Sequence, residues 1–170
     1  DFDADTPAWT EPDGIPEGLF GFILDLAGDG AGQWLAVGEE ETLLFSGDDG
    51  QSWSAIGAGA FRAAVWTGSR WIAVGESSAA AADPNGDWTE IVHPDTFDQG
   101  IALAADSDGE VLALGLEGRI FHLADNAWVE IETGQDGIDF RHLTALGAGA
   151  WRIGASDGLY ALVQTEDGWL

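Results

Sequence analysis

The chain has 170 residues, of which 31 are acidic and five are arginine, with no lysine, so its formal net charge is −26. Phosphate backbones and anionic lipid surfaces are bound through Lys and Arg side chains, so we expect neither nucleic acid nor a membrane as a partner. A hydrophobic fraction of 45% is enough for a folded core, and the absence of cysteine excludes disulfides and thiolate metal sites.

The N-terminal segment, residues 1–18, is predicted to hold one strand and a connector. Within it, Ala8, Trp9, Thr10 and Glu11 read as the fourth strand of a blade whose first three strands are missing, because Trp9-Thr10-Glu11 repeats the sequence Trp88-Thr89-Glu90. This strand would be available to pair with an open sheet edge elsewhere.

After this segment, one short sequence recurs four times at intervals of about forty residues, which is the period of a propeller blade. Each copy is a short apolar run that ends in or next to glycine, and the copies are Gln33–Gly38, Arg70–Gly75, Glu110–Gly115 and Ala150–Ala155. Around each copy, strand-length runs alternate with turns rich in Gly, Asp and Asn, and no segment has a convincing helical period. The sequence therefore predicts an all-β chain, a small β-propeller of four four-stranded antiparallel blades.

The predicted blades cover residues 19–60, 61–100, 101–139 and 140–170. A tryptophan opens the fourth strand of the first three blades, at Trp53, Trp88 and Trp128. The last repeat reaches Trp169 one residue before its end, so we expect the fourth blade to lack its own fourth strand. An incomplete blade leaves unpaired backbone groups that another strand must cover.

The N-terminal strand is the expected cover, by one of two routes. In cis it would return to the fourth blade and lock a four-bladed ring. In trans it would dock on a neighbouring molecule and build a closed dimer or an open filament. The cis route is favoured because closing a loop within one chain costs less than bringing two molecules together.

The first blade carries the pattern S-x-D-x-G-x-x-W at Ser46, Asp48, Gly50 and Trp53. Its Ser and Asp side chains can bond the turn backbone, and its Gly supplies a positive-φ position, so the motif has a structural role. Together with Trp34–Gly38, this stretch resembles the Asp-box (BNR) β-propeller repeat, in particular that of photosystem II stability and assembly factor-like proteins. The resemblance covers residues 19–170 and implies a propeller, but it indicates almost nothing about activity.

The resemblance also suggests sialidase chemistry, because sialidases with this repeat use three arginines and a tyrosine nucleophile. Here Tyr160 is the only tyrosine, and only Arg62 and Arg141 occupy equivalent places, near the start of strand one, where they could face a ligand. Trp66 departs from the repeat pattern and is a candidate platform for stacking on a sugar. We therefore expect no catalytic residues and no enzyme activity.

Cofactors are not expected. Asp106 and Asp108 resemble a fragment of a calcium loop, without the remaining ligands of the full motif, so they are candidates for weak Ca²⁺ binding only. The chain contains no methionine and residue 1 is an aspartate, which indicates a processed chain. Removal of a secretory signal is the expected reason and predicts an extracellular or periplasmic location.

These features together predict a non-catalytic, exported propeller that acts as a structural or interaction module. Its expected partner is itself, as a dimer or filament, or another protein. A carbohydrate-binding, lectin-like propeller is the alternative, and a glycoside hydrolase of the sialidase type is a more distant one.

Overall fold

The computed structural model describes residues 12–15, 21–57, 59–76, 78–83, 87–97, 99–135, 137–166 and 168–170. In these residues the chain forms four four-stranded sheets, and the helical structure is a single 3₁₀ turn, η1 (Leu116–Gly118). The prediction of an all-β chain with four antiparallel blades is confirmed.

Each blade is a meander in which consecutive strands pair antiparallel. Blade 1 contains β1 (Ile23–Gly28), β2 (Trp34–Gly38), β3 (Leu43–Ser46) and β4 (Ser54–Ala55), and blade 2 contains β5 (Phe61–Trp66), β6 (Trp71–Gly75), β7 (Ser78–Ala82) and β8 (Trp88–Glu90). Blade 3 contains β9 (Ala102–Ala105), β10 (Val111–Leu114), β11 (Ile120–Ala124) and β12 (Ala127–Ile131), and blade 4 contains β13 (Phe140–Gly147), β14 (Ala150–Ala155), β15 (Leu159–Thr165) and β16 (Gly168–Trp169).

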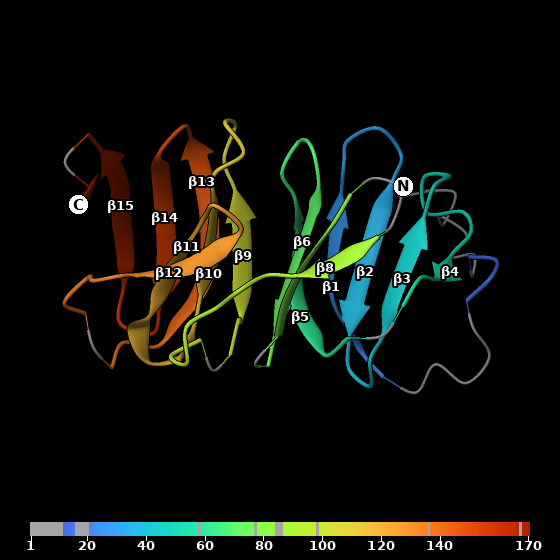
Figure 1. The fold of residues 1–170 in the computed structure, drawn as a ribbon, viewed down its shortest axis with the longest axis horizontal. Helices are drawn as coiled ribbons and strands as arrows, with labels where there is room; N and C mark the ends of the chain where they lie inside the picture. Colours follow the sequence, from blue (N-terminus) through green and yellow to red (C-terminus); the bar gives the residue numbers. More distant parts are fainter. Residues whose placement is uncertain are drawn as a thin grey trace, which may run out of the picture.

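The first strands of the blades pack in sequence, β1 on β5, β5 on β9 and β9 on β13. Figure 1 shows blade 1 and blade 4 at opposite ends of the molecule, with blades 2 and 3 between them, so the blades form an arc. The predicted closing strand, Ala8, Trp9, Thr10 and Glu11, lies outside the described residues, and closure of blade 4 by this strand is not seen.

The expectation that blade 4 lacks its own fourth strand is wrong. β15 continues to Thr165 and turns back at once, so that Gly168 and Trp169 pair with Thr165 and Gln164 as β16. This strand has two residues and pairs with the C-terminal end of β15.

Three apolar cores lie between successive blades, and alternate residues of each second strand point to opposite neighbours. Leu35 of β2 and Trp71 of β6 belong to the core between blades 1 and 2. Leu112 of β10 and Trp151 of β14 hold the equivalent places between blades 3 and 4. The recurring apolar run is therefore the residue set by which one blade packs on the next.

The glycine that ends the recurring run is required by a close backbone approach. The first strand is irregular where it meets this glycine, between Phe61 and Ala63 in blade 2. A Cβ atom at Gly75 would stand 1.8 Å from the carbonyl oxygen of Ala60, which no side chain can tolerate. Gly38 is restricted in the same way by the carbonyl oxygen of Phe22.

Candidate functional site

Blade 4 differs from the other blades in the register of its fourth strand. In blade 2, Trp88 lies opposite Ala82, which in turn lies opposite Trp71 of the second strand. The residue of blade 4 at the place of Ala82 is Leu162, opposite Trp151. Trp169 instead lies opposite Gln164, so β16 covers only the C-terminal end of β15.

Among the residues that the structure describes, the N-terminal part of β15 has no paired strand on the edge that faces away from β14. Val163 exchanges both main-chain hydrogen bonds with Leu170, at 2.8 and 2.9 Å. Because backbone groups of alternate residues point to the same edge, Ala161 and Leu159 direct their N–H and C=O groups to this side. Within the described residues, neither has a main-chain partner there, and both are exposed.

In blades 1 and 2, the corresponding edge of the third strand is paired with residues at the end of the fourth strand. The N–H of Ile56 donates to the carbonyl of Leu43 at 3.1 Å, and the N–H of Ile91 donates to the carbonyl of Ala79 at 2.9 Å. Leu43 and Ala79 hold the place of Leu159, because all three lie opposite the same position of the second strand. We call the stretch Leu159–Leu162 the open edge.

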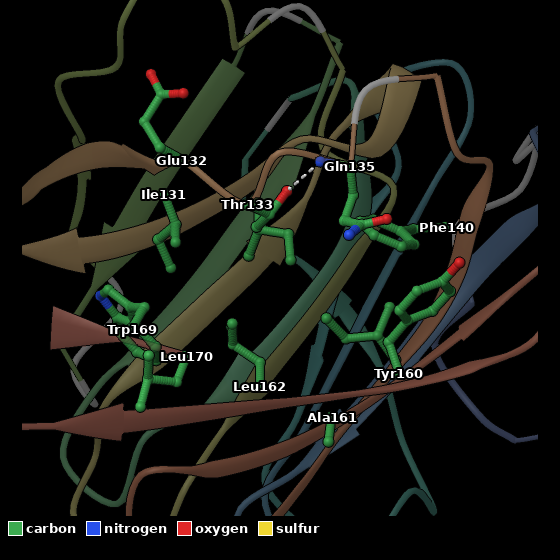
Figure 2. Close-up of a pocket in the computed structure, with 12 residues that line it drawn as sticks. Ile131, Glu132, Thr133, Gln135, Phe140, Tyr160, Ala161, Leu162, Trp169 and Leu170 are labelled. Atoms are coloured by element: carbon green, nitrogen blue, oxygen red, sulfur yellow. Dashed lines mark hydrogen bonds between the residues drawn. The ribbon is translucent and has the colours of Figure 1, made fainter.

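A groove of about 210 Å³ lies beside the open edge, between blades 3 and 4. Its apolar wall includes Ile131 from β12 and Phe140 and Leu162 from blade 4. Figure 2 shows Trp169 and Leu170 on one side of the groove and Phe140 and Tyr160 on the other, with Leu162 between them. The groove can take an apolar side chain from a strand added at the open edge.

Among the described residues, blade 4 lacks an aromatic stack that blades 2 and 3 have. Phe61 stacks on Trp88 with ring centroids 5.8 Å apart, and Phe97 stacks on Trp128 at 5.7 Å. Phe140 holds the place of Phe61, yet its neighbour is Tyr160, which it meets edge-on. The face of Phe140 therefore has no stacking tryptophan among the described residues.

The tryptophan of blade 4, Trp169, packs instead against His122, with ring centroids 5.1 Å apart. The His122 ring is in turn hydrogen-bonded to the carboxylate of Glu110. Trp169 is thus anchored on blade 3 at the rim of the groove, away from Phe140.

Tyr160 borders the groove with its hydroxyl directed outward. The hydroxyl donates to the carboxylate of Asp157 at 2.9 Å, and this hydrogen bond raises the pKa of Tyr160. A raised pKa keeps the phenol protonated, which is the opposite of what a tyrosine nucleophile needs.

The predicted ligand-facing arginines are not brought together. Arg62 in blade 2 pairs with Glu76 at 2.6 Å, and Arg141 in blade 4 pairs with Asp139 at 2.6 Å. Blade 3 separates the two pairs. Each arginine is held by a neighbouring carboxylate, an arrangement that sequence reasoning missed because the acidic partners lie in loops.

Trp66 does not stand free as a sugar platform. It is half-buried, belongs to the core between blades 1 and 2, and lies 4.9 Å from Trp71 between ring centroids. Its deviation from the repeat pattern reflects packing at the end of β5.

The Asp-box side chains form a compact turn in blade 1. The hydroxyl of Ser46 accepts the N–H of Gly50 at 3.0 Å, and the carboxylate of Asp48 accepts the N–H of Ser52 at 2.8 Å and its hydroxyl at 2.6 Å. These bonds from Ser52 lower the pKa of Asp48. The indole N–H of Trp53 donates to the carbonyl of Gly50, which ties the turn to the end of the motif.

Asp106, one of the two calcium candidates, is a turn residue. Its carboxylate accepts the N–H groups of Asp108, Glu110 and Gly149 at 2.9, 3.0 and 2.7 Å. Asp108 is exposed, and the described residues contain no cluster of three or more side chains that could hold a metal ion. The bond to Gly149 shows that Asp106 also ties blade 3 to blade 4.

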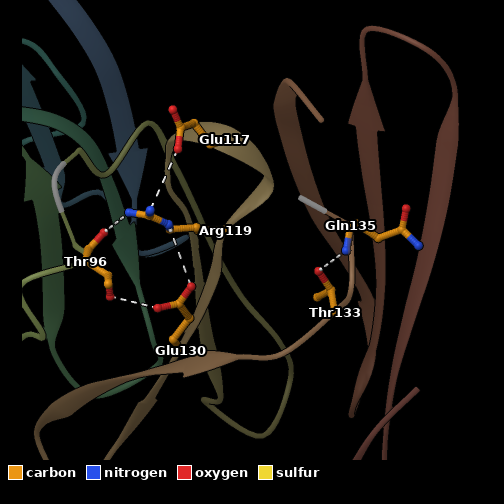
Figure 3. A network of polar contacts seen from close by, with 6 residues as sticks. All are labelled: Thr96, Glu117, Arg119, Glu130, Thr133 and Gln135. Carbon is orange, nitrogen blue, oxygen red and sulfur yellow. Dashed lines mark hydrogen bonds and ion pairs between the residues drawn. The ribbon is translucent and has the colours of Figure 1, made fainter. Parts of the chain in front are cut away.

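The linker between blades 2 and 3 is fixed by polar contacts that the sequence did not reveal (Figure 3). Arg119 donates to the carbonyl of Thr96 at 2.9 Å, and the hydroxyl of Thr96 donates to Glu130 at 2.7 Å. Arg119 also pairs with Glu130 at 3.8 Å and with Glu117 at 3.7 Å. These contacts hold the linker beside the buried Phe97.

No known family model matches the chain, and no curated protein matches its sequence. No helix in the described residues has the length and apolar character to cross a membrane.

Several solved structures share the fold. A structure of YCF48 bound to D1 peptide matches with a TM-score of 0.65 and 16% identity, over 92% of this chain and 55% of that chain. The WD40 β-propeller domain of Doa1 matches with a TM-score of 0.60 and 11% identity, over 89% and 68%. PorZ, a surface component of the type-IX secretion system of Porphyromonas gingivalis, matches with a TM-score of 0.62 and 15% identity, over 88% and 20%.

These matches establish the β-propeller fold. The chain spans about half the length of the YCF48 chain and a fifth of PorZ. At such low identity the likeness concerns the fold, and the site has to be judged from the geometry of blade 4.

Proposed function

We propose that this chain is a non-catalytic interaction module that binds an extended segment of a protein partner on blade 4. The observation that carries the proposal is the open edge, Leu159–Leu162, which lies beside an apolar groove. Addition of a strand to an exposed edge is a common mode of peptide recognition, in which the main chain gives affinity and alternate side chains give specificity.

The main chain of the partner would bond to Ala161 and Leu159, as the fourth strands of blades 1 and 2 bond to the equivalent residues. The partner residue opposite Leu162 would direct its side chain into the groove, on the side of the sheet where Trp88 stacks on Phe61 in blade 2. An aromatic residue suits this place, because stacked aromatic pairs contribute about 0.5–1.5 kcal/mol beyond their area burial.

The charge of the chain limits the partner further. At a net charge of −26, an acidic segment would be repelled, and the rim of the groove adds the carboxylate of Glu132. A segment with basic or neutral residues around the aromatic anchor would associate faster than an acidic segment and would be preferred as a partner.

The structural neighbours support a protein ligand in general terms. One of the matching propellers, YCF48, has a structure in complex with a peptide. An exported location remains a prediction from the sequence, as does the absence of a cofactor.

The experiment is peptide binding measured by fluorescence anisotropy. An eight-residue peptide with a central tryptophan and basic flanks should bind, and its Trp→Ala version should bind about tenfold more weakly, as expected for the loss of a stacked anchor. Ala161→Pro removes the N–H at the open edge and should weaken binding by about tenfold or more.

Ala161→Ser is the matched control, because it keeps the main-chain N–H, and it should bind like the unaltered protein. Equal binding by the Pro and Ser variants would contradict strand addition. Binding of a glycan on an array, with no binding of any aromatic peptide, would favour the lectin alternative instead.

A further inference from the structure

A second groove, of about 440 Å³, lies between blades 1 and 2, apart from the site on blade 4. Its apolar wall includes Leu43 from blade 1 and Phe61, Ala80 and Trp88 from blade 2. Glu90 lines the groove as well, and the described residues that line it include no arginine and no histidine. The groove therefore combines an apolar wall with a negative charge.

The third strand of blade 2 carries a small side chain where blade 3 carries a ring. Ala80 lies opposite Ala73 in the recurring run, and its equivalent Phe121 lies opposite Ala113 in the same run of blade 3. Phe121 is buried and meets Phe97 edge-on, with ring centroids 4.9 Å apart. Blade 2 thus has an alanine beside the groove at the place where blade 3 has a buried aromatic side chain.

Blade 2 keeps the carboxylate that accompanies this position. Glu90 lies opposite Ala80, and Glu130 lies opposite Phe121. Because side chains alternate along a strand, Glu90 is on the same face of β8 as Trp88. Trp88 packs against the core between blades 1 and 2, so Glu90 lies on the groove side of β8.

In blade 3, the equivalent carboxylate is paired with a guanidinium (Figure 3). Arg119 pairs with Glu130 at 3.8 Å and donates to the carbonyl of Thr96 at 2.9 Å. The hydroxyl of Thr96 donates to Glu130 at 2.7 Å. Blade 3 therefore supplies a cation to this carboxylate from its own third strand region.

Blade 2 lacks the corresponding guanidinium. Ser78 stands two residues before Ala80, as Arg119 stands two residues before Phe121. Among the described residues, the carboxylate of Glu90 has no hydrogen-bond or ion-pair partner, and Glu90 is exposed. The groove therefore keeps the acceptor of the blade 3 pair, without the arginine and the aromatic ring that accompany it there.

We infer that the groove between blades 1 and 2 binds an arginine side chain of a partner protein, with the guanidinium on Glu90 and the methylene stem along the apolar wall. A planar guanidinium matches a carboxylate and stacks on aromatic side chains such as Trp88, and its stem buries well against apolar surface. Asp87 adds a second carboxylate to the lining, and the net charge of −26 favours a basic partner.

The test is an NMR titration of the full chain at low ionic strength, where an exposed ion pair is least screened. The probes are N-acetylarginine methylamide and its citrulline counterpart, which has the same shape and no charge. The arginine probe should shift the indole N–H of Trp88 and the amide of Ala80 in a saturable way, and the citrulline probe should shift neither. Equal shifts with both probes, or no shift with arginine, would overturn the inference.

The role of the carboxylate is tested by Glu90→Gln. This variant should bind the arginine probe about fivefold more weakly, which corresponds to about 1 kcal/mol for an exposed ion pair. Glu166→Gln is the matched control, because it removes one negative charge from an exposed residue outside the groove. It should bind like the unaltered protein, and equal weakening by both substitutions would contradict a pair with Glu90.

Two further variants give blade 2 the side chains of blade 3. Ala80→Phe should fill the groove and abolish the shift of the Trp88 indole N–H. Ser78→Arg should supply Glu90 with a guanidinium from the same chain and weaken probe binding, while Glu166→Gln again controls for the same change in net charge. Ser78→Arg keeps the test decisive if the larger ring disturbs the fold, and unchanged binding by a folded Ser78→Arg variant would overturn the inference.

Discussion

Trp169 lies opposite Gln164 in the last hairpin, whereas Trp88 lies opposite Ala82, the equivalent of Leu162. Blade 4 therefore has four strands, but its fourth strand covers only the C-terminal end of β15. Among the described residues, the groove and the open edge lie beside this displaced strand.

The tryptophans of blades 3 and 4 should differ in their contribution to stability. Trp128 is 3% exposed and stacks on Phe97, so Trp128→Ala should lower the free energy of unfolding by about 3–5 kcal/mol. Trp169 is half-buried on a two-residue strand, and Trp169→Ala should cost clearly less. Urea unfolding measures both, and equal losses would contradict the displaced register.

Gly75 should not tolerate a side chain. A methyl group there would collide with the carbonyl of Ala60, and Gly75→Ala should cost about 1–3 kcal/mol, as overpacking typically does. Gly158 is the matched control, because a methyl group at that position would meet no other atom within 4 Å. Thermal unfolding should show a lower Tm for Gly75→Ala and an unchanged Tm for Gly158→Ala.

The Asp-box turn should add a pH-dependent part to stability. Hydrogen bonds from Ser52 hold the pKa of Asp48 below its ordinary value of 3.8, so the folded state favours the ionised form. The stabilisation is present above that value and is lost as the pH falls through the lower, folded pKa. A difference in Tm between the unaltered protein and Asp48→Ala should therefore be present at pH 7 and shrink below pH 3.8. A difference that does not depend on pH would contradict this role.

The repeat pattern was enough to predict the blades because each blade is a meander of consecutive strands. Its turn residues and tryptophans therefore lie close together in the sequence. The register of β16 could not be predicted in the same way. It depends on how far β15 runs before it turns, and Trp169 looks the same in the sequence whether it pairs with Leu162 or Gln164.

The candidate site escaped prediction for a related reason. The sequence pointed to Arg62, Arg141 and Trp66, but the first two are held by carboxylates from loops and the third packs in a core. The groove is lined by residues of blades 3 and 4 that lie far apart in the sequence, and no local residue pattern signals that they come together. The predicted N-terminal strand, Ala8–Glu11, lies outside the described residues and stays a prediction.

Amide hydrogen exchange at Ala161, followed by NMR in dilute protein with and without the tryptophan peptide, tests the central claim most directly. The N–H of Ala161 points to the open edge, so it should exchange rapidly in the free protein and become protected when the peptide binds. The N–H of Leu162 faces β14 and should be protected in both states. An Ala161 amide that is already protected in the dilute monomer, or stays unprotected at saturating peptide, would contradict strand addition to blade 4.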